Sequence, residues 1–193
     1  MKITLTIPEL IINIKNTYNL ATYEDNMYFY EDANIFCTLL SIKHNIDVVK
    51  LAGIVSALSP GCNWEQNKKD TIELLSGKIK GFSTYPVQSE KALQIYRLVN
   101  CTVENVYTII YGKGAIKTGN FFLNILLKST VVTIDRHAAK IALNITAGGS
   151  IPLTIKQYNL IQSAYIIAAS DLQINPIHLQ AVTWTTYKRV NNR

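Results

Sequence analysis

The chain carries the sequence VVTIDRHAAKIA at residues 131–142. Four apolar or β-branched residues lead directly into Asp135, and the apolar positions that follow recur at helical spacing. These positions are Ala138, Ile141, Ala142 and Ile145. The pattern predicts that Asp135 begins a helix, where its carboxylate can accept the free backbone N–H groups of the first turn. A helix cap is the simplest role for Asp135, and any further role depends on the rest of the chain.

Two glycines upstream of this stretch mark a turn between two predicted helices. Residues 106–118 read VYTIIYGKGAIKT, so an apolar helix ends at Gly112 and another begins after Gly114. Glycine tolerates positive φ, and the backbone N–H groups that begin a helix can bind a phosphate with help from the helix dipole. Lys113 adds a positive charge to the turn. A simple helix–helix connection with a glycine cap explains the same pattern.

Lys117 lies in the first turn of the second helix, 18 residues before Asp135. Partial burial at such a position would lower the pKa of a lysine, which is what an amine nucleophile needs. A solvated first-turn lysine is the alternative. In the apolar stretch that follows, residues 121–127, Asn124 is the only polar residue.

Length, composition and charge set the broad class of the protein. The 193 residues suffice for one large domain or two small lobes, and 48% apolar with 17% charged residues indicates a globular chain. The net charge of +6 and the pI near 9.2 fit a protein that binds a polyanion, although many basic proteins bind no nucleic acid.

Cysteine usage and hydropathy predict a soluble, intracellular protein. Cys37, Cys62 and Cys101 are widely spaced and odd in number, which suggests reduced thiols rather than a disulfide framework. Pro8 and Glu9 interrupt the apolar residues near the N-terminus, so no signal peptide is expected. No apolar run approaches the roughly 20 residues that span a bilayer, so no membrane partner is expected.

Apolar periodicity predicts helices along nearly the whole chain, and the fold class is all-α. The expected helices cover about 8–19, 25–43, 47–58, 64–76, 88–99, 102–111, 115–127, 136–146, 154–171 and 176–190. Residues 131–134 could be extended, but this run is too short to anchor a sheet.

Capping residues and loop residues support these boundaries. Expected helix starts lie at Asp47, Ser89, Thr102 and Thr154, while Pro152 and Pro176 lie at or just before starts. Expected stops lie at Gly77, Gly112, Gly148 and Gly149. Residues 77–86 form the clearest loop and a candidate surface linker.

Four pieces of sequence, in order, resemble one known family. They are IVSALSPGCNWEQNK at 54–68, Tyr85 followed by KALQI at 91–95, the glycine hairpin, and the Asp135 stretch. From about Leu51 to Asn144 the chain resembles the helix-hairpin-helix (HhH-GPD) DNA glycosylase superfamily, which includes endonuclease III and oxoguanine glycosylase. The interval from Lys117 to Asp135 also matches that family.

The resemblance implies a two-lobed helical fold that forms a single domain over residues 1–193. Residues 51–144 would be its core, and the N- and C-terminal helices would pack as a second lobe. It also implies a partner, duplex DNA with one nucleotide flipped out of the stack. Asp135 would stabilise the positive charge that develops on the sugar when the N-glycosidic bond breaks. Lys117 would attack C1′ and form a Schiff base.

The resemblance also suggests which other residues contact DNA. Ser59, Trp64, Asn67 and Asn124 would line the base pocket, and backbone contacts would come from Gly112, Lys113, Gly114, Thr118, Arg136 and His137. Trp64 could stack on a flipped base or equally be a core residue, and a packing role is favoured for His137. The C-terminal helix is expected to pack through Leu179, Val182 and Trp184, with its basic end solvated or touching DNA.

The chain departs from the family pattern in two places. No proline precedes Gly112, and one extra residue separates Gly114 from Lys117, which leaves the role of Lys117 open. No cysteine follows Cys101, so the iron–sulfur loop of the endonuclease III branch is missing, and neither a metal nor a cofactor is expected.

The blocks LSP at 58–60, WEQN at 64–67 and LQAVTW at 179–184 look more like small phage-encoded relatives, some of which process hypermodified thymidine. The location would then be the cytoplasm of a bacterial host. The leading hypothesis is a glycosylase that acts on a modified base. Two alternatives stay open: a transferase or pyrophosphorylase-like enzyme that modifies the base, and a non-catalytic module that only holds DNA. Sequence does not indicate the oligomeric state.

Overall fold

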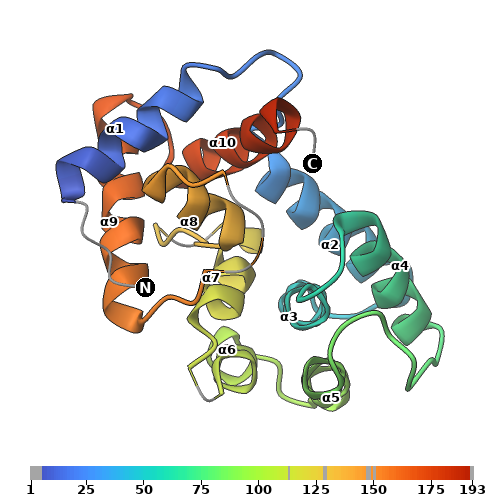
Figure 1. Ribbon diagram of the computed structural model, residues 1–193. Helices are drawn as coiled ribbons and strands as arrows, with labels where there is room; N and C mark the ends of the chain where they lie inside the picture. Colours follow the sequence, from blue (N-terminus) through green and yellow to red (C-terminus); the bar gives the residue numbers. More distant parts are fainter. Residues whose placement is uncertain (1–5, 113, 128–129, 147–148, 150, 192–193) are drawn as a thin grey trace. The chain divides into compact units, whose positions relative to one another are not determined.

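The structure is a computed structural model that describes residues 6–112, 114–127, 130–146, 149 and 151–191. Within these residues the chain forms ten α-helices and no β-strand (Figure 1), which confirms the predicted all-α class. The longest helix has 17 residues. Across the described ranges, no helix has both the length and the apolar character needed to cross a membrane.

Contacts between residues divide the chain into two compact units. We call residues 31–128 the central unit, and residues 1–30 together with 129–193 the terminal unit. The central unit is therefore one continuous stretch, whereas the terminal unit combines both ends of the chain.

The central unit contains most of α2 (Phe29–His44) and five further helices. These are α3 (Val48–Leu58), α4 (Trp64–Leu75), α5 (Pro86–Arg97), α6 (Val103–Tyr111) and α7 (Ile116–Ile125). Every residue of α3 from Leu51 to Leu58 is buried, and this helix packs against α4, α5, α6 and α7. A helix that is apolar on all sides is stable only when neighbours surround it, which explains the position of α3 in the core.

The terminal unit contains four helices besides the first residues of α2. They are α1 (Ile7–Tyr18), α8 (Arg136–Leu143), α9 (Ile155–Asp171) and α10 (Pro176–Val190). The N-terminal helix α1 packs against α8, α9 and α10 through its buried residues Leu10 and Ile14. Residues close to the two ends of the sequence thus share one core.

Most predicted helix starts are confirmed by hydrogen bonds of the capping side chains. Asp47 accepts from the backbone N–H of Val49, and Thr102 accepts from that of Asn105. Thr154 begins α9 with a complete capping box that includes Gln157.

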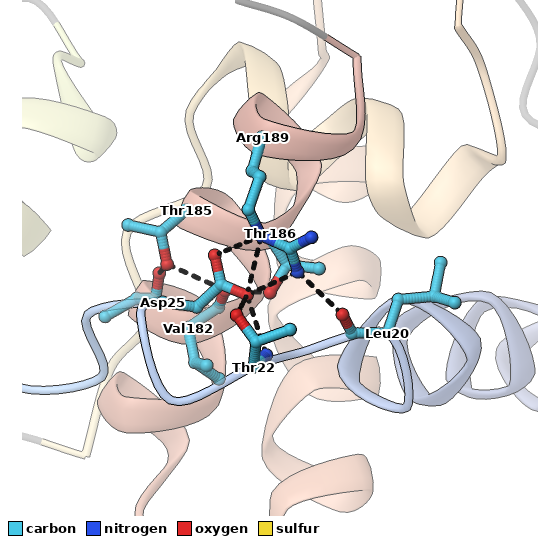
Figure 2. Close-up of polar contacts among 8 residues, drawn as sticks. Leu20, Thr22, Asp25, Val182, Thr185, Thr186 and Arg189 are labelled. Carbon is cyan, nitrogen blue, oxygen red and sulfur yellow. Dashed lines mark hydrogen bonds and ion pairs between the residues drawn. The ribbon is translucent and has the colours of Figure 1, made fainter.

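The predicted start of α2 at residue 25 is wrong, because Asp25 serves a different purpose (Figure 2). Its carboxylate accepts from the backbone N–H of Thr22 at 2.9 Å and from Nη2 of Arg189 at 2.7 Å. The turn that presents Asp25 to α10 keeps this segment out of the helix, and α2 begins at Phe29.

Two other predicted helix boundaries are also wrong. The fifth helix begins at Pro86 after Tyr85, because proline is favourable in a first turn, and Ser89 lies inside the helix. The eighth helix ends at Leu143, and its cap Asn144 adopts a left-handed conformation with φ 53°. This asparagine takes the capping position expected for Gly148 and Gly149, and Gly148 lies outside the described residues.

The loop at residues 77–86 lies within the central unit and does not link the two units. The backbone N–H of Ser83 donates to Oδ2 of Asp70 at 2.7 Å, and the hydroxyl of Thr84 donates to the carbonyl of Pro60 at 2.7 Å. These two bonds attach the loop to α4 and to the end of α3, so the interpretation as a linker is wrong.

The three cysteines are free thiols. Burial raises the pKa of Cys37 to about 12. Burial, reinforced by the nearby carboxylates of Asp70 and Asp47 respectively, raises the pKa of Cys62 and of Cys101. Thiolates are the reactive form of cysteine, so none of these thiols is activated as a nucleophile.

Candidate active site

The segment that leads to Asp135 is held in place by two side chains of α9. Residues 130–135 have no regular secondary structure. The backbone N–H of Ile134 donates to the hydroxyl of Tyr158 at 2.9 Å, and this hydroxyl donates to the carbonyl of Val132 at 3.2 Å. The N–H of Val132 donates to Oε1 of Gln162 at 3.3 Å. Tyr158 and Gln162 are four residues apart on one face of α9, so they satisfy backbone groups that a neighbouring strand would otherwise bind.

Asp135 caps α8, as the sequence predicts. Its Oδ1 accepts from the backbone N–H groups of His137 at 2.9 Å and Ala138 at 2.8 Å. Its Oδ2 has no hydrogen-bond partner among the described residues, and the side chain is partly exposed. One carboxylate oxygen therefore fixes the position of the group while the other can accept a further contact.

His137 follows Asp135 and is packed into the terminal unit, with only 8% of its surface exposed. Its ring centroid lies 5.7 Å from that of Tyr187 and 6.3 Å from that of Trp184. Its Nε2 accepts from Nε of Arg136 at 3.3 Å, while the buried Nδ1 has no partner. This burial fits the packing role favoured above, and a phosphate contact by His137 stays a prediction.

Burial lowers the pKa of His137, because a charged imidazolium is poorly solvated inside the unit. The positive charges of Arg136, Lys188 and Lys140 lower it further, against an opposing effect of Asp135. The imidazole is therefore neutral at pH 7. Of these cations, Arg136 has the most exposed side chain.

The predicted hairpin is present in the central unit. Gly112 and Gly114 both have positive φ, 44° and 94°, and the N–H groups of Gly114 and Ala115 donate to the carbonyl of Tyr111 at 3.0 and 2.8 Å. Lys113, predicted to contact DNA, lies outside the described residues.

The positive φ of Gly112 disfavours a side chain at this position, and Lys91 lies close to it. The Nζ of Lys91 donates to the carbonyl of Ile110 at 2.6 Å, and a Cβ on Gly112 would lie only 3.2 Å from that nitrogen. Burial lowers the pKa of Lys91. This lysine from α5 thus holds the end of α6 in the conformation that allows the turn.

Lys117 and Thr118 begin α7 after Ala115, which offers no side-chain cap. The side chain of Lys117 is exposed, so the partial burial that would favour an amine nucleophile is not present. Thr118 is buried and its carbonyl accepts from Oγ of Ser56 at 2.7 Å. Lys117 belongs to the central unit and Asp135 to the terminal unit.

The four residues predicted to line a base pocket all belong to the central unit, and two of them bind to α3. Oγ of Ser59 donates to the carbonyl of Ser56 at 2.9 Å, and Nδ2 of Asn67 donates to the carbonyl of Val55 at 3.1 Å. Because Ser56 also binds Thr118, the end of α3 brings Ser59, Asn67 and Thr118 to one place.

The remaining two predicted pocket residues differ in exposure. Trp64 begins α4 and is partly exposed, with its ring centroid 5.8 Å from that of Phe36 and Nζ of Lys68 5.8 Å from its centroid. Asn124 is fully buried, and neither atom of its amide has a hydrogen-bond partner. Unpaired buried polar atoms are costly, so Asn124 is the most unusual of the four.

Asp135 lines neither of two shallow hollows on the described surface. One, of about 450 Å³, lies between α2 and α4 and includes Phe36, Lys69 and Ile72. The other, of about 550 Å³, lies in the terminal unit near Tyr18 and Tyr28. Among the residues that the structure describes, no group of three or more metal-ligating side chains comes together.

Sequence reasoning missed the tertiary contacts of the segment before Asp135 and of the first turn of α8. Tyr158 and Gln162 carry no sequence signal beyond their spacing, because their partners are about 25 to 30 residues away. Trp184 was expected to pack like Leu179 and Val182, which are buried, yet it is partly exposed. Its position four residues before Lys188 is a signal that could have been used.

Comparison with known proteins identifies a family for this chain. No curated protein and no solved structure matches the chain. Residues 1–191 match a protein family whose function is unknown, DUF7178. Since the match covers nearly the whole sequence, the chain belongs to the DUF7178 family.

Proposed function

We propose that this protein is a DNA glycosylase-like enzyme that hydrolyses the N-glycosidic bond of a flipped, modified base, with Asp135 as its essential carboxylate. The observation that carries the proposal is the state of this carboxylate. Its Oδ1 is fixed by two backbone N–H groups, while Oδ2 has no hydrogen-bond partner among the described residues. The resemblance to the HhH-GPD superfamily supports the same role.

The chemistry follows from the charge that develops on the sugar. As the bond between C1′ and the base breaks, C1′ becomes cationic, and a nearby carboxylate stabilises this charge. Water then adds to C1′ and loses a proton, which neutralises the negative charge of the departing base. Asp135 would stabilise the cation and orient the water through Oδ2. Asp135 belongs to a segment that Tyr158 holds in place, so the carboxylate needs little reorganisation to stabilise the cation.

Binding of the DNA backbone is assigned to positive charges and backbone N–H groups. Arg136 is exposed beside Asp135, and the start of α7 after Gly114 lacks a side-chain cap. The net charge of +6 favours association with a polyanion. Affinity for DNA is therefore expected to fall steeply as salt rises, because phosphate contacts release counterions.

The decisive experiment compares wild type with Asp135→Asn. Asparagine can still accept the two N–H groups of α8, so the variant is expected to fold. Asp47→Asn is the matched control, since Asp47 also caps a helix, in the central unit. Duplexes with normal, damaged and hypermodified bases are incubated with each protein, and the product masses are recorded.

Release of a free base by wild type and by Asp47→Asn, but not by Asp135→Asn, is the expected result. A nucleotide of changed mass would instead assign a base-modifying enzyme. Unchanged DNA with intact binding would assign a non-catalytic module, which the two ordinary capping bonds of Asp135 also permit. Borohydride trapping separately tests Lys117: base release without a covalent adduct would mean that water is the nucleophile.

A further inference from the structure

We propose that Trp184, with Lys188 over its ring and Arg136 on the neighbouring first turn of α8, is a nucleotide-stacking surface on the terminal unit. Its ligand is an unstacked nucleotide of DNA, with the base against the indole and the phosphates against the two cations. The inference deepens the proposed function, because it assigns a substrate contact beside Asp135, and it can be tested without any catalytic assay.

The position of Trp184 relative to Asp135 is set by neighbouring rings. The ring of His137, two residues after Asp135, lies at 77° to that of Trp184 with centroids 6.3 Å apart. On α2, the ring of Phe29 is tilted by 47° to the indole with centroids 5.6 Å apart. Trp184 is thus supported by two aromatic neighbours, next to the first turn of α8, and stays partly exposed.

One cation lies at this indole and a second lies at the adjacent His137, and neither has an ion pair among the described residues. Nζ of Lys188 lies 4.3 Å from the ring centroid of Trp184. Arg136 contacts His137 through its Nε, and its side chain is exposed. A partly exposed aromatic ring with cations nearby that have no ion pair suits single-stranded nucleic acid, since bases stack on the ring and phosphates pair with the charges.

Lys188 does not prevent a base from reaching the indole. Its flexible side chain is only partly buried, and a cation–π contact at such a site is weaker than the stacking of a base. A base that stacks on Trp184 would displace the ammonium group, which is then free to meet a phosphate. This exchange also explains why a lysine, with its long flexible stem, suits the position.

The chain contains two tryptophans, which makes a direct test possible. Trp64→Phe leaves Trp184 as the only indole, and Trp184→Phe leaves Trp64. A short single strand of DNA is titrated into Trp64→Phe while indole emission is followed under excitation that spares tyrosine. Saturable quenching of Trp184 is expected, because a stacked base quenches indole fluorescence.

Affinity is measured in parallel by the anisotropy of a labelled strand. Trp184→Phe is expected to weaken binding by roughly threefold to tenfold, and Lys188→Gln and Arg136→Gln are each expected to reduce the salt dependence by about one charge. Lys15→Gln is the matched control, because Lys15 lies on the same unit in an ion pair with Asp171.

Unquenched Trp184 emission while anisotropy reports bound DNA would overturn the proposal, as would unchanged affinity in Trp184→Phe. The two proposals fail separately. Quenching without base release would support the stacking surface and contradict the proposed enzyme activity. Base release without quenching would support the enzyme activity and contradict the stacking surface.

Discussion

Asn124 is a polar residue of α7, and the residues next to it in the sequence are apolar. Its amide is completely buried, and neither its oxygen nor its nitrogen has a hydrogen-bond partner. An unpaired buried polar group costs about 1–3 kcal/mol. Residues that reduce stability in this way are often kept for function, so Asn124 is the residue at which stability and activity are expected to oppose each other.

Asn124→Leu is expected to raise the free energy of unfolding by about 1–2 kcal/mol, because leucine has the same number of side-chain heavy atoms and leaves no polar atom unpaired. Urea unfolding at constant pH measures this. Asn67→Leu is the matched control and is expected to gain less than Asn124→Leu, since only Oδ1 of Asn67 lacks a partner and the substitution also removes the bond from Nδ2 to Val55. If Asn124 also recognises a base, Asn124→Leu is expected to lose base release despite its greater stability. A loss of stability in Asn124→Leu would contradict the prediction.

At the scale of elements, α9 organises the segment that carries Asp135. An extended segment without a neighbouring strand leaves its backbone groups unsatisfied, and here Tyr158 and Gln162 bind them. The position of Asp135 therefore depends on a helix that follows it in sequence. A substitution on α9 can disturb the carboxylate without touching it.

Tyr158→Phe is expected to lower the free energy of unfolding by about 1–3 kcal/mol, because the N–H of Ile134 and the carbonyl of Val132 lose their partner. Hydrogen exchange of the Ile134 amide is expected to become faster than in wild type. Tyr23→Phe is the control, since Tyr23 is 96% exposed. Equal protection of Ile134 in Tyr158→Phe and wild type would show that the hydroxyl does not hold the segment.

Close packing of α3 against α6 yields a prediction for Gly53. A Cβ at this position would clash with Cγ1 of Val106. Gly53→Ala is expected to lower stability by about 1–3 kcal/mol, and Val106→Ala in the same chain is expected to recover part of the loss. Chemical denaturation of both single variants and the double variant measures the coupling. Strict additivity of the two effects would rule out the clash as the cause.

The sequence predicts helices well because their signals are local. Apolar spacing and caps such as Asp47 and Thr154 lie within a few residues of the structure they specify. The start of α2 was predicted wrongly because it depends on Arg189, which is 164 residues from Asp25. For the candidate site, the cap at Asp135 is a local feature and was found. The contacts of Tyr158 and Trp184 are made only by tertiary packing, so no local pattern reveals them.

At the scale of the whole molecule, the two units differ in which parts of the sequence they combine. The central unit is continuous, whereas the terminal unit depends on contacts between the two ends of the sequence. Arg189 illustrates this dependence (Figure 2), because its guanidinium binds Asp25 through Nε and Nη2 and also donates to the carbonyl of Leu20. The hydroxyl of Thr22 is a further donor to Asp25.

A fragment of residues 29–128, which keeps α2 whole, is expected to fold alone. Its core contains α3 and the helices that surround it, and none of these requires a distant part of the sequence. Circular dichroism should show a helical spectrum, and heating should give a single cooperative transition. A non-cooperative loss of signal would mean that the central unit needs the rest of the chain.

Acid is expected to destabilise the terminal unit in two ranges of pH. The hydrogen bonds and charge of Arg189 hold the pKa of Asp25 below its usual range. The stability that this provides is complete above the unfolded pKa of about 3.9 and is lost as pH falls through the folded pKa. His137 is buried in its neutral form with a lowered pKa, so stability also falls as pH drops below about 6.5, the unfolded value.

The acidic range is tested with Asp25→Asn in a Trp64→Phe background, where emission of Trp184 reports the terminal unit. At pH 7 the variant is expected to be less stable by about 1–3 kcal/mol, because a charged acceptor of several hydrogen bonds becomes neutral. Below about pH 4 the difference from the parent is expected to shrink, since acid then neutralises Asp25 in the parent as well. A difference that stays constant from pH 7 to pH 3 would show that Asp25 does not act through its charge. The contribution of Arg189 to the stability of the terminal unit would then come from its hydrogen bond to the carbonyl of Leu20.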